Sequence, residues 1–310
     1  MKSFYKLSLL CVMGLSTILL TTTAHADPTL AITKGGSNYA TGIALGKTVD
    51  VIPIPHSGTT FYVPKVNDGV MDFGISNPSQ LYWAYNGVEM FDKAYTNLRF
   101  VANLQEFRPV VMVRNNSELK TVDDLRGTRI PSEWRGAPLF QKNFTDLLAN
   151  GGLTWDDVNP VPVATYKDHI SAFANNRIDV FKGTLGGGAS RKLNATIRGG
   201  VRMLCMNKDN GEYTKEWPGQ YLYSYNPDPS TPTVRSKDCV GIMYNYTLWT
   251  NKDVPNDVVR DLVLKLYNDH TVFRGGSKLT SGFNRDDMPE YDRIPMHLGA
   301  IDAYKSLKLR

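Results

Sequence analysis

Cysteine and histidine are scarce in this sequence, and neither is grouped as a metal site requires. Three cysteines and five histidines occur among 310 residues. The histidines lie far apart, and no cysteine–histidine set has the short spacing of a zinc site. We therefore expect no metal ion and no other cofactor.

The sequence also lacks the short motifs of common enzyme classes. It has no Gly-x-Ser-x-Gly nucleophile elbow and no Gly-rich phosphate-binding loop that ends in Lys-Ser or Lys-Thr. His56 and Ser57 are adjacent, but neighbouring side chains on an extended chain point apart, and no orienting acid can be assigned to them. These absences predict a protein that is not an enzyme.

Charge of one sign is not concentrated anywhere along the chain. The formal net charge is +5, and it falls to +3 without Lys2 and Lys6 near the N-terminus. Lysine and arginine are scattered, which argues against nucleic acid as a partner. A mild positive excess, with 16 tyrosines and 26 glycines, suits capture of a small anion in a polar cleft.

Long apolar runs are absent except at the N-terminus. The segment Leu7–Leu20 is apolar or small, and Ala24-His25-Ala26 has the small-x-small pattern that signal peptidase cleaves. The run is too short for a membrane span, and the residue before Cys11 is too large for a lipoprotein anchor. Residues 1–26 are therefore predicted to be a signal peptide. Its removal would give a mature periplasmic protein whose first residue is Asp27.

Two cysteines, Cys205 and Cys239, remain after this cleavage. In an oxidising compartment they are candidates for a disulfide, but separation in sequence says nothing about distance in space. Two separate buried thiols are an equally good interpretation.

The mature sequence alternates short apolar strands with helical patterns, which is typical of an α/β fold with a largely parallel sheet. In the first half, strands are expected at 29–33, 51–55, 71–75, 98–104 and 109–113, and helices at 39–49 and 61–67. The pattern restarts after Arg114, with a helix expected at 139–149 and a strand at 178–181. A long β-like run at 240–249 could return the chain to the first half.

Three successive strand-to-helix turns are rich in Gly, Ser, Thr and Asn. They are Lys34–Asn38, His56–Thr60 and Ser76–Ser79. In an open α/β sheet such turns meet at the carboxyl edge, where ligands bind. Free N–H groups at helix N-termini suit an anion there, although each turn alone is also explained by ordinary helix capping.

With these segments in order, the sequence resembles the TAXI family, the solute receptors of one class of TRAP transporters. The resemblance runs from about Thr29 to Ala300. The matching pieces are Gly35–Tyr39, Gly69–Gly74, Ala84–Gly87, Leu119–Gly127, Gly152–Val158 and Trp217–Gln220.

The resemblance implies a type II periplasmic-binding-protein fold with two α/β lobes and a cleft between them. The expected first lobe is 27–113 plus 241–310, and the second is 114–240. The resemblance also implies delivery of a small organic anion to a TRAP-type integral membrane permease. We expect the protein to be a monomer. A periplasmic sensor that presents the same kind of ligand to a signalling receptor is the alternative.

The sequence departs from the family at the turns expected to hold the ligand. His56–Tyr62 and Ser76–Ser79 lack the acidic residues that relatives carry, and the second-lobe turn contains Trp134 and Arg135. An α-ammonium group needs an acidic acceptor, so a glutamate-type ligand is disfavoured. A carboxylate without an amine fits better, with an aromatic or extended body against Trp134 or Phe61.

We expect ligand contacts from both lobes, with Arg135 gripping the carboxylate through paired hydrogen bonds. Lys182 and Arg191 flank the Gly183–Gly188 turn and could add positive potential to the cleft, but solvated surface positions are the favoured interpretation of both. The full set of expected contacts is Gly36, Ser37, Asn38, Tyr39, Ser57, Gly58, Thr59, Thr60, Ser76, Asn77, Trp134, Arg135, Gly136, Leu185, Gly186 and Gln220.

Overall fold

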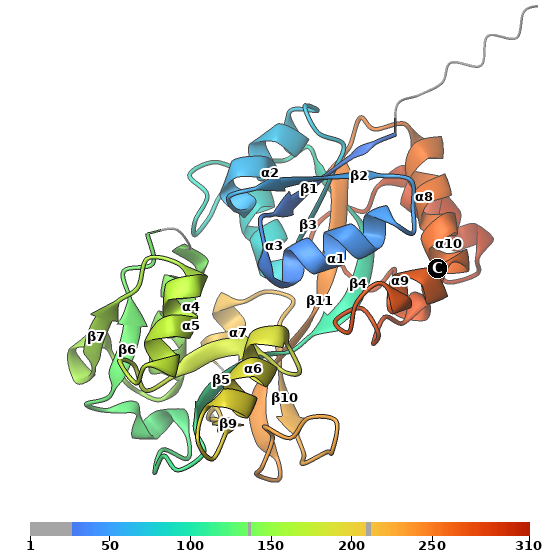
Figure 1. Ribbon diagram of the computed structural model, residues 1–310. Helices are drawn as coiled ribbons and strands as arrows, with labels where there is room; N and C mark the ends of the chain where they lie inside the picture. The colour runs from blue at the N-terminus through green and yellow to red at the C-terminus, as the bar shows by residue number, and fades with distance from the viewer. Residues whose placement is uncertain (1–26, 136–137, 209–211) are drawn as a thin grey trace, which may run out of the picture.

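The structure is a computed structural model that describes residues 27–135, 138–208 and 212–310 (Figure 1). The predicted signal peptide, residues 1–26, and the predicted contact Gly136 lie outside these ranges. Within them the chain forms two lobes of mixed α/β structure, as the sequence predicts (Figure 1).

The first lobe contains most of a six-stranded sheet. The strands of this sheet are β1 (Thr29–Thr33), β2 (Ile52–His56), β3 (Phe73–Ser76), β4 (Leu98–Phe107), β10 (Tyr221–Tyr225) and β11 (Cys239–Asn251). Strand β10 lies beside the second lobe (Figure 1). β1 pairs in parallel with β2 and β3, whereas β11 runs antiparallel to β3, β4 and β10. The sheet is therefore mixed, and the expectation of a largely parallel sheet holds for β2, β1 and β3. β11 is antiparallel because it returns to the sheet from the second lobe.

Helices cover this sheet on both sides. They are α1 (Gly36–Gly46), α2 (Thr59–Asn67), α3 (Pro78–Asn86), α8 (Asn256–Asn268), α9 (His270–Gly275) and α10 (Leu298–Ser306). Leu30, Ala31 and Ile32 in β1 are all fully buried, as expected for a strand covered on both faces. The apolar positions of α8 recur with helical spacing at Val259, Leu262, Val263 and Leu266, and this face packs into the core.

The second lobe contains two small sheets. β5 (Pro109–Arg114) lies between β8 (Phe181–Thr184) and β9 (Val201–Met203), and β6 (Arg129–Ser132) pairs in parallel with β7 (Asn159–Pro162). The helices are α4 (Pro138–Asn150), α5 (Tyr166–Ala174), α6 (Gly188–Thr196) and α7 (Glu212–Glu216). Short 3-10 turns occur at Val122–Leu125, Trp155–Asp157 and Arg285–Asp287.

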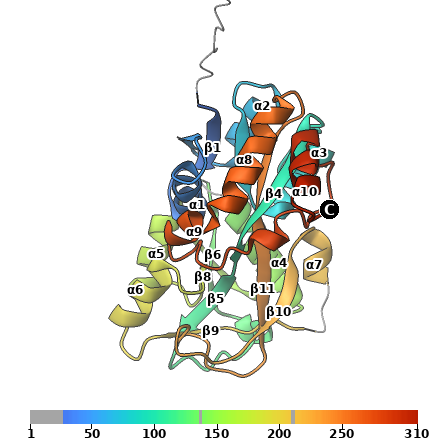
Figure 2. The same ribbon diagram turned by 90° about the vertical axis from the view of Figure 1, so that its right-hand side faces the viewer.

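Two long strands connect the lobes. β4 continues through Arg108 into β5, and residues 244–251 of the 13-residue β11 pair with β4 (Figure 2). The first half of β11 also pairs with β10. These crossover strands are where one lobe can rotate against the other. The residue boundaries given above for the lobes stay a prediction.

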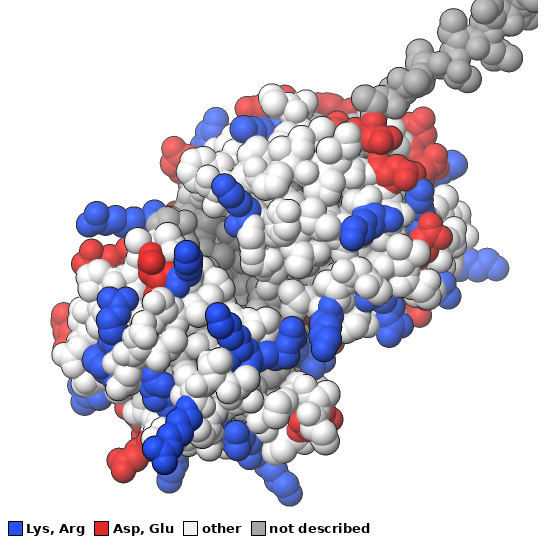
Figure 3. All heavy atoms as spheres, viewed as in Figure 1, with Lys and Arg blue, Asp and Glu red and all other residues white. Residues whose placement is uncertain are grey.

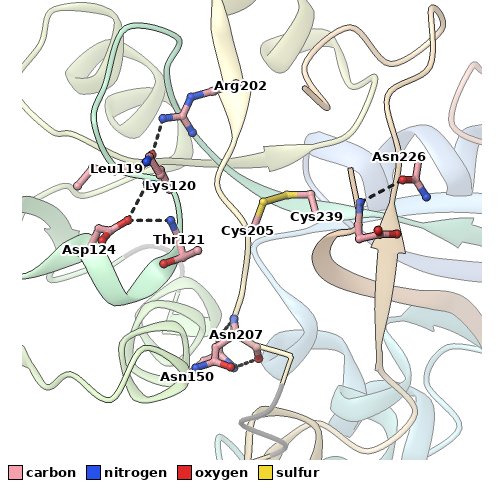
Figure 4. The surroundings of a disulfide bond; sticks show 11 residues. Leu119, Lys120, Thr121, Asp124, Asn150, Arg202, Cys205, Asn207, Asn226 and Cys239 are labelled. Carbon is pink, nitrogen blue, oxygen red and sulfur yellow. Dashed lines mark hydrogen bonds between the residues drawn. A yellow bond between two sulfur atoms is a disulfide. The ribbon is translucent and has the colours of Figure 1, made fainter. Parts of the chain in front are cut away.

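Cys205 and Cys239 form a disulfide (Figure 4). The bond joins the segment that follows β9 to the first residue of β11, and the two Cα atoms lie 5.0 Å apart. The structure thus resolves the choice between a disulfide and two buried thiols. The disulfide also links the second lobe to the start of the crossover strand β11.

Across the described ranges, no helix is both long enough and apolar enough to span a membrane.

Candidate functional site

A cavity of about 590 Å³ lies between the two lobes and is lined by residues of both. This volume is within the range of sites for small organic ligands. Figure 3 shows the surface hollowed between the lobes, with Lys and Arg side chains around the hollow.

The first-lobe wall is made by the turns that lead into α1 and α2. Gly35 and Gly36 have φ angles of 80° and 71°, a left-handed conformation that glycine adopts without strain. Asn38 holds this turn in place: its Oδ1 accepts a hydrogen bond from the Thr33 N–H at 2.6 Å, and its Nδ2 donates to the Ile75 carbonyl at 2.9 Å. The turn is therefore fixed to both β1 and β3.

The first turns of α1 and α2 have unused backbone donors. Gly35 and Gly58 occupy the N-cap positions, and within the described residues neither helix has a side-chain cap. α3 is different, because Asn77 accepts the N–H of Gln80 at 2.8 Å. The first residues of α1 and α2 line the cavity, and they carry the positive end of each helix dipole, which favours an anionic ligand group.

The second-lobe wall is formed by β8, α4 and α5. Lys182, Gly183 and Thr184 line the cavity from β8, and Phe140 and Tyr166 line it from the two helices. The Phe140 ring stacks on Trp134 with centroids 4.8 Å apart, and it lies 5.5 Å from the ring of Tyr166. This wall therefore combines aromatic rings with the half-buried side chain of Lys182.

The charge at the cavity has one sign. Lys34, Lys167 and Lys182 are among the described residues that line it, and Asp, Glu, Arg and His are not. Lys34 and Lys167 are exposed, whereas Lys182 is half-buried. Burial lowers the pKa of the Lys182 ammonium to about 7, and the charge of Asp146 opposes that shift. An anion that displaced water around Lys182 would stabilise its charged form.

The crossover strands form a third wall. Phe107 of β4 lies 5.2 Å from the ring of Tyr244 and 5.0 Å from that of Tyr246, both on β11. Burial raises the pKa of both phenols well above the usual range, so they stay neutral and can donate a hydrogen bond.

Polar contacts already cross between the lobes at the edge of the cavity. The hydroxyls of Ser37 on α1 and Thr184 on β8 are 3.4 Å apart. Gln220, which precedes β10, donates to the Ser79 hydroxyl at 3.2 Å, and that hydroxyl donates to the Pro218 carbonyl at 2.9 Å. The two lobes therefore contact each other in this conformation.

The structure brings nine of the sequence-predicted contacts together around the cavity: Gly36, Ser37, Asn38, Ser57, Gly58, Thr59, Thr60, Asn77 and Gln220. It does not place Tyr39, Ser76, Trp134, Arg135, Leu185 or Gly186 on the cavity wall. Ser76 is buried, and its hydroxyl is bonded to the Asn77 carbonyl and the Trp249 indole. Whether the nine residues contact a ligand stays a prediction.

The predicted arginine grip is not present in this conformation. The Arg135 side chain is 86% exposed and has only a loose pairing with Glu133 at 3.8 Å. Trp134 is buried, and its Nε1 donates to the Pro131 carbonyl at 3.3 Å. It therefore supports Phe140 from behind, and Phe140 contributes the aromatic surface expected from Trp134.

Lys182, and not Arg135, lies on the cavity wall, and it is half-buried where the sequence predicts a solvated surface residue. The sequence places the preceding strand at 178–181, which leaves Lys182 in a loop, whereas β8 runs from Phe181 to Thr184. The sequence feature that could have indicated a partly buried lysine is the run Phe181-Lys182-Gly183, in which an aromatic residue and a glycine flank Lys182.

A metal site is not supported by the residues that the structure describes. Among them, no three His, Cys, Asp or Glu side chains are grouped so that they could hold a metal ion.

Comparisons with known proteins agree with this architecture. The sequence profile of the NMT1-like family matches residues 30–306. A periplasmic sulfonate-binding protein, SsuA, from Methylobacillus flagellatus has 16% identity and a TM-score of 0.55, over 91% of this chain and 95% of its own.

Two further solved structures show the same fold. MatC from Rhodopseudomonas palustris, solved with bound malate, has 13% identity and a TM-score of 0.55, over 91% of this chain and 96% of its own. A TctC solute-binding protein from Polaromonas has 12% identity and a TM-score of 0.52, over 85% of this chain and 91% of its own. At these identities the likeness concerns the two-lobed fold.

Proposed function

The chain belongs to the NMT1-like family, whose members are periplasmic solute-binding proteins, and from that premise we propose that it captures a small organic carboxylate. We propose further that it delivers this ligand to a TRAP-type membrane permease.

The observation that carries the ligand class is the one-sided charge of the cavity. The described lining residues include Lys34, Lys167 and Lys182 but no carboxylate. A ligand with an ammonium group would leave that group without an acidic partner in the cleft, and burying an unpaired charge is costly. An anion without an amine fits the same surface well.

Each wall has a separate role in this proposal. Lys182 supplies the formal positive charge from the second lobe. The uncapped N–H groups of α1 and α2, with the Ser37 and Thr59 hydroxyls, supply hydrogen bonds from the first lobe. Because the donors come from both lobes, binding favours a closed arrangement. The likeness of fold to MatC, which holds malate, is consistent with an anionic ligand.

A thermal-shift screen of carboxylic acids tests the ligand class, because a ligand that binds only the folded state raises the melting temperature. We expect stabilisation by carboxylates without an amine and little effect of glutamate. A screen in which amino acids stabilise the protein and amine-free acids do not would overturn the assignment.

The TRAP partner is supported by the motif resemblance to TAXI receptors. Proteoliposomes that contain the candidate permease provide the test. Uptake that requires this protein and an ion gradient, without ATP, is the expected result. Uptake that depends on ATP would assign the protein to an ABC system.

Export completes the proposal. Cleavage after Ala26 should yield a periplasmic protein that starts at Asp27, and N-terminal sequencing of the periplasmic fraction decides this point.

A further inference from the structure

The described wall of the cavity is rich in aromatic rings as well as in donors. Seven of its thirty residues are aromatic, about twice the 11% share of the whole chain. They are Phe61, Phe107, Phe140, Tyr166, Trp217, Tyr244 and Tyr246. A short diacid would cover little of this surface, because its two charged ends require polar partners.

Phe61 is the most exposed of these rings, with 62% of its surface accessible. It lies in the first turn of α2, next to Thr59 and Thr60, which also line the cavity. A ligand that covers this exposed apolar ring removes it from water, and this burial stabilises the complex.

Phe140 faces the cavity from the other lobe and is held in a fixed orientation. Its ring stacks on Trp134 at 4.8 Å with an interplanar angle of 20°, and Trp134 is itself 2% exposed. A ring supported in this way loses little conformational entropy when it contacts a ligand.

Only one of the three lysines is embedded in the wall. Lys182 is half-buried beside the aromatic surface of α4 and α5, whereas Lys34 and Lys167 are exposed and stay hydrated. The cavity thus has one desolvated positive charge and a large aromatic surface.

Building on the proposed function, we propose that the ligand is an aromatic acid: one anionic head at Lys182 and the α1 and α2 N-termini, and a ring between Phe61 and Phe140. Each lobe supplies one of the two phenylalanines, so that they contact opposite faces of that ring. Ring–ring contacts in stacked or edge-on geometry add to the stabilisation from area burial alone.

Calorimetry with matched pairs of acids tests this inference. Benzoate is compared with cyclohexanecarboxylate, and 3-phenylpropionate with 3-cyclohexylpropionate, so that each pair has the same number of carbon atoms. Succinate and glutamate complete the set, and benzenesulfonate tests whether the anionic group must be a carboxylate. We expect each aryl acid to bind about tenfold more tightly than its non-aromatic partner.

Variants locate the ring. Phe61→Leu and Phe140→Leu keep apolar bulk and remove one aromatic face each, so each variant should lower the aryl-to-alkyl affinity ratio about threefold, and the double variant should bring it close to one. Tyr223→Ala is the control, because Tyr223 is a 41% exposed aromatic of β10 outside the cavity wall. It should leave the ratio unchanged.

The outcomes separate this inference from the proposed function. If the saturated acids or succinate bind at least as tightly as every aryl acid, the aromatic assignment is wrong and the carboxylate-binding function stands. If no acid binds, both fail. An unchanged ratio in both Phe→Leu variants would overturn the placement of the ring.

Discussion

The Nζ of Lys142 lies 3.2 Å from Oε2 of Glu89, so helix α4 of the second lobe is ion-paired with the segment that follows α3 in the first lobe. Lys142 also pairs with Asp146 at 3.2 Å, and its ammonium lies 5.6 Å from the ring centroid of Trp217. Met90 and Asn143, the neighbours of the paired residues, line the cavity. This pair therefore spans the cleft at its edge and must separate when the lobes open.

Glu89→Gln should weaken ligand binding by about two- to fivefold. The substitution keeps the shape of the side chain and removes its charge, and a partly exposed ion pair is worth up to about 1 kcal/mol. The closed form loses that contribution, so the apparent affinity falls. Calorimetry measures the affinity, and small-angle scattering should show a larger radius of gyration for the ligand-free variant than for the wild type.

Asp253→Asn is the matched control for this variant. Asp253 pairs with its sequence neighbour Lys252 within the first lobe at 3.2 Å, so its loss should not change closure. If Glu89→Gln and Asp253→Asn behave alike, the Lys142–Glu89 pair does not bias the closed form.

Lys182→Met should weaken binding of the best carboxylate by about 30-fold or more at pH 6.5. Methionine retains most of the side-chain length but has no charge, and breaking a desolvated ion pair commonly costs about 2–5 kcal/mol. Arg135→Ala should change the affinity by less than about threefold, because that side chain is exposed. The reverse order of effects would restore Arg135 as the carboxylate partner.

Ligand affinity should depend on pH through Lys182. The pKa of this ammonium is lowered to about 7 in the ligand-free protein, so the group is charged below pH 7 and increasingly neutral above it. A carboxylate binds the charged form and raises this pKa. Affinity should be constant below about pH 6 and should fall by up to about tenfold per pH unit above 7.

The neighbours of Lys182 do not produce the same profile. His169 on α5 accepts the Lys182 backbone N–H at 2.9 Å, and burial lowers the pKa of that imidazole to about 3. Burial raises the pKa of Tyr166 to about 12. Asp146 on α4 pairs with Lys142 and accepts the Trp217 indole N–H at 2.7 Å. Lys182→Arg should flatten the profile between pH 6 and 9; a profile that remains steep in this variant points to another group.

The turns of the first lobe could be predicted from the sequence because they depend on local rules. Gly, Ser, Thr and Asn between a strand and a helix determine where each helix begins, and parallel strands bring those beginnings to one edge. Gly36–Asn38 and Ser57–Thr60 accordingly line the cavity.

The second-lobe wall could not be predicted in the same way, because tertiary contacts decide which side chain faces the cleft. Asp179 accepts hydrogen bonds from the Arg129 backbone and guanidinium, which fixes 178–180 outside the strand and moves β8 to Phe181–Thr184. Phe140 and Phe144 of α4 draw Trp134 into the core. Adjacent positions in one loop thus separate, with Trp134 buried and Arg135 in solvent.

The last prediction concerns the disulfide between Cys205 and Cys239. The cysteines are 34 residues apart, and closing a loop of that length in the unfolded chain corresponds to about 3–4 kcal/mol of stabilisation by chain entropy. A Cys205→Ala/Cys239→Ala variant should lose roughly that free energy of unfolding in urea. Dithiothreitol should destabilise the wild type but leave the variant unchanged.

Neither cysteine lines the cavity, so ligand affinity should change by less than about threefold. A tenfold loss of affinity in the folded variant would show instead that the bond sets the path of β11 between the lobes, since Cys239 is the first residue of that strand. If the variant and the wild type have the same free energy of unfolding, the disulfide does not reduce the conformational entropy of the unfolded chain.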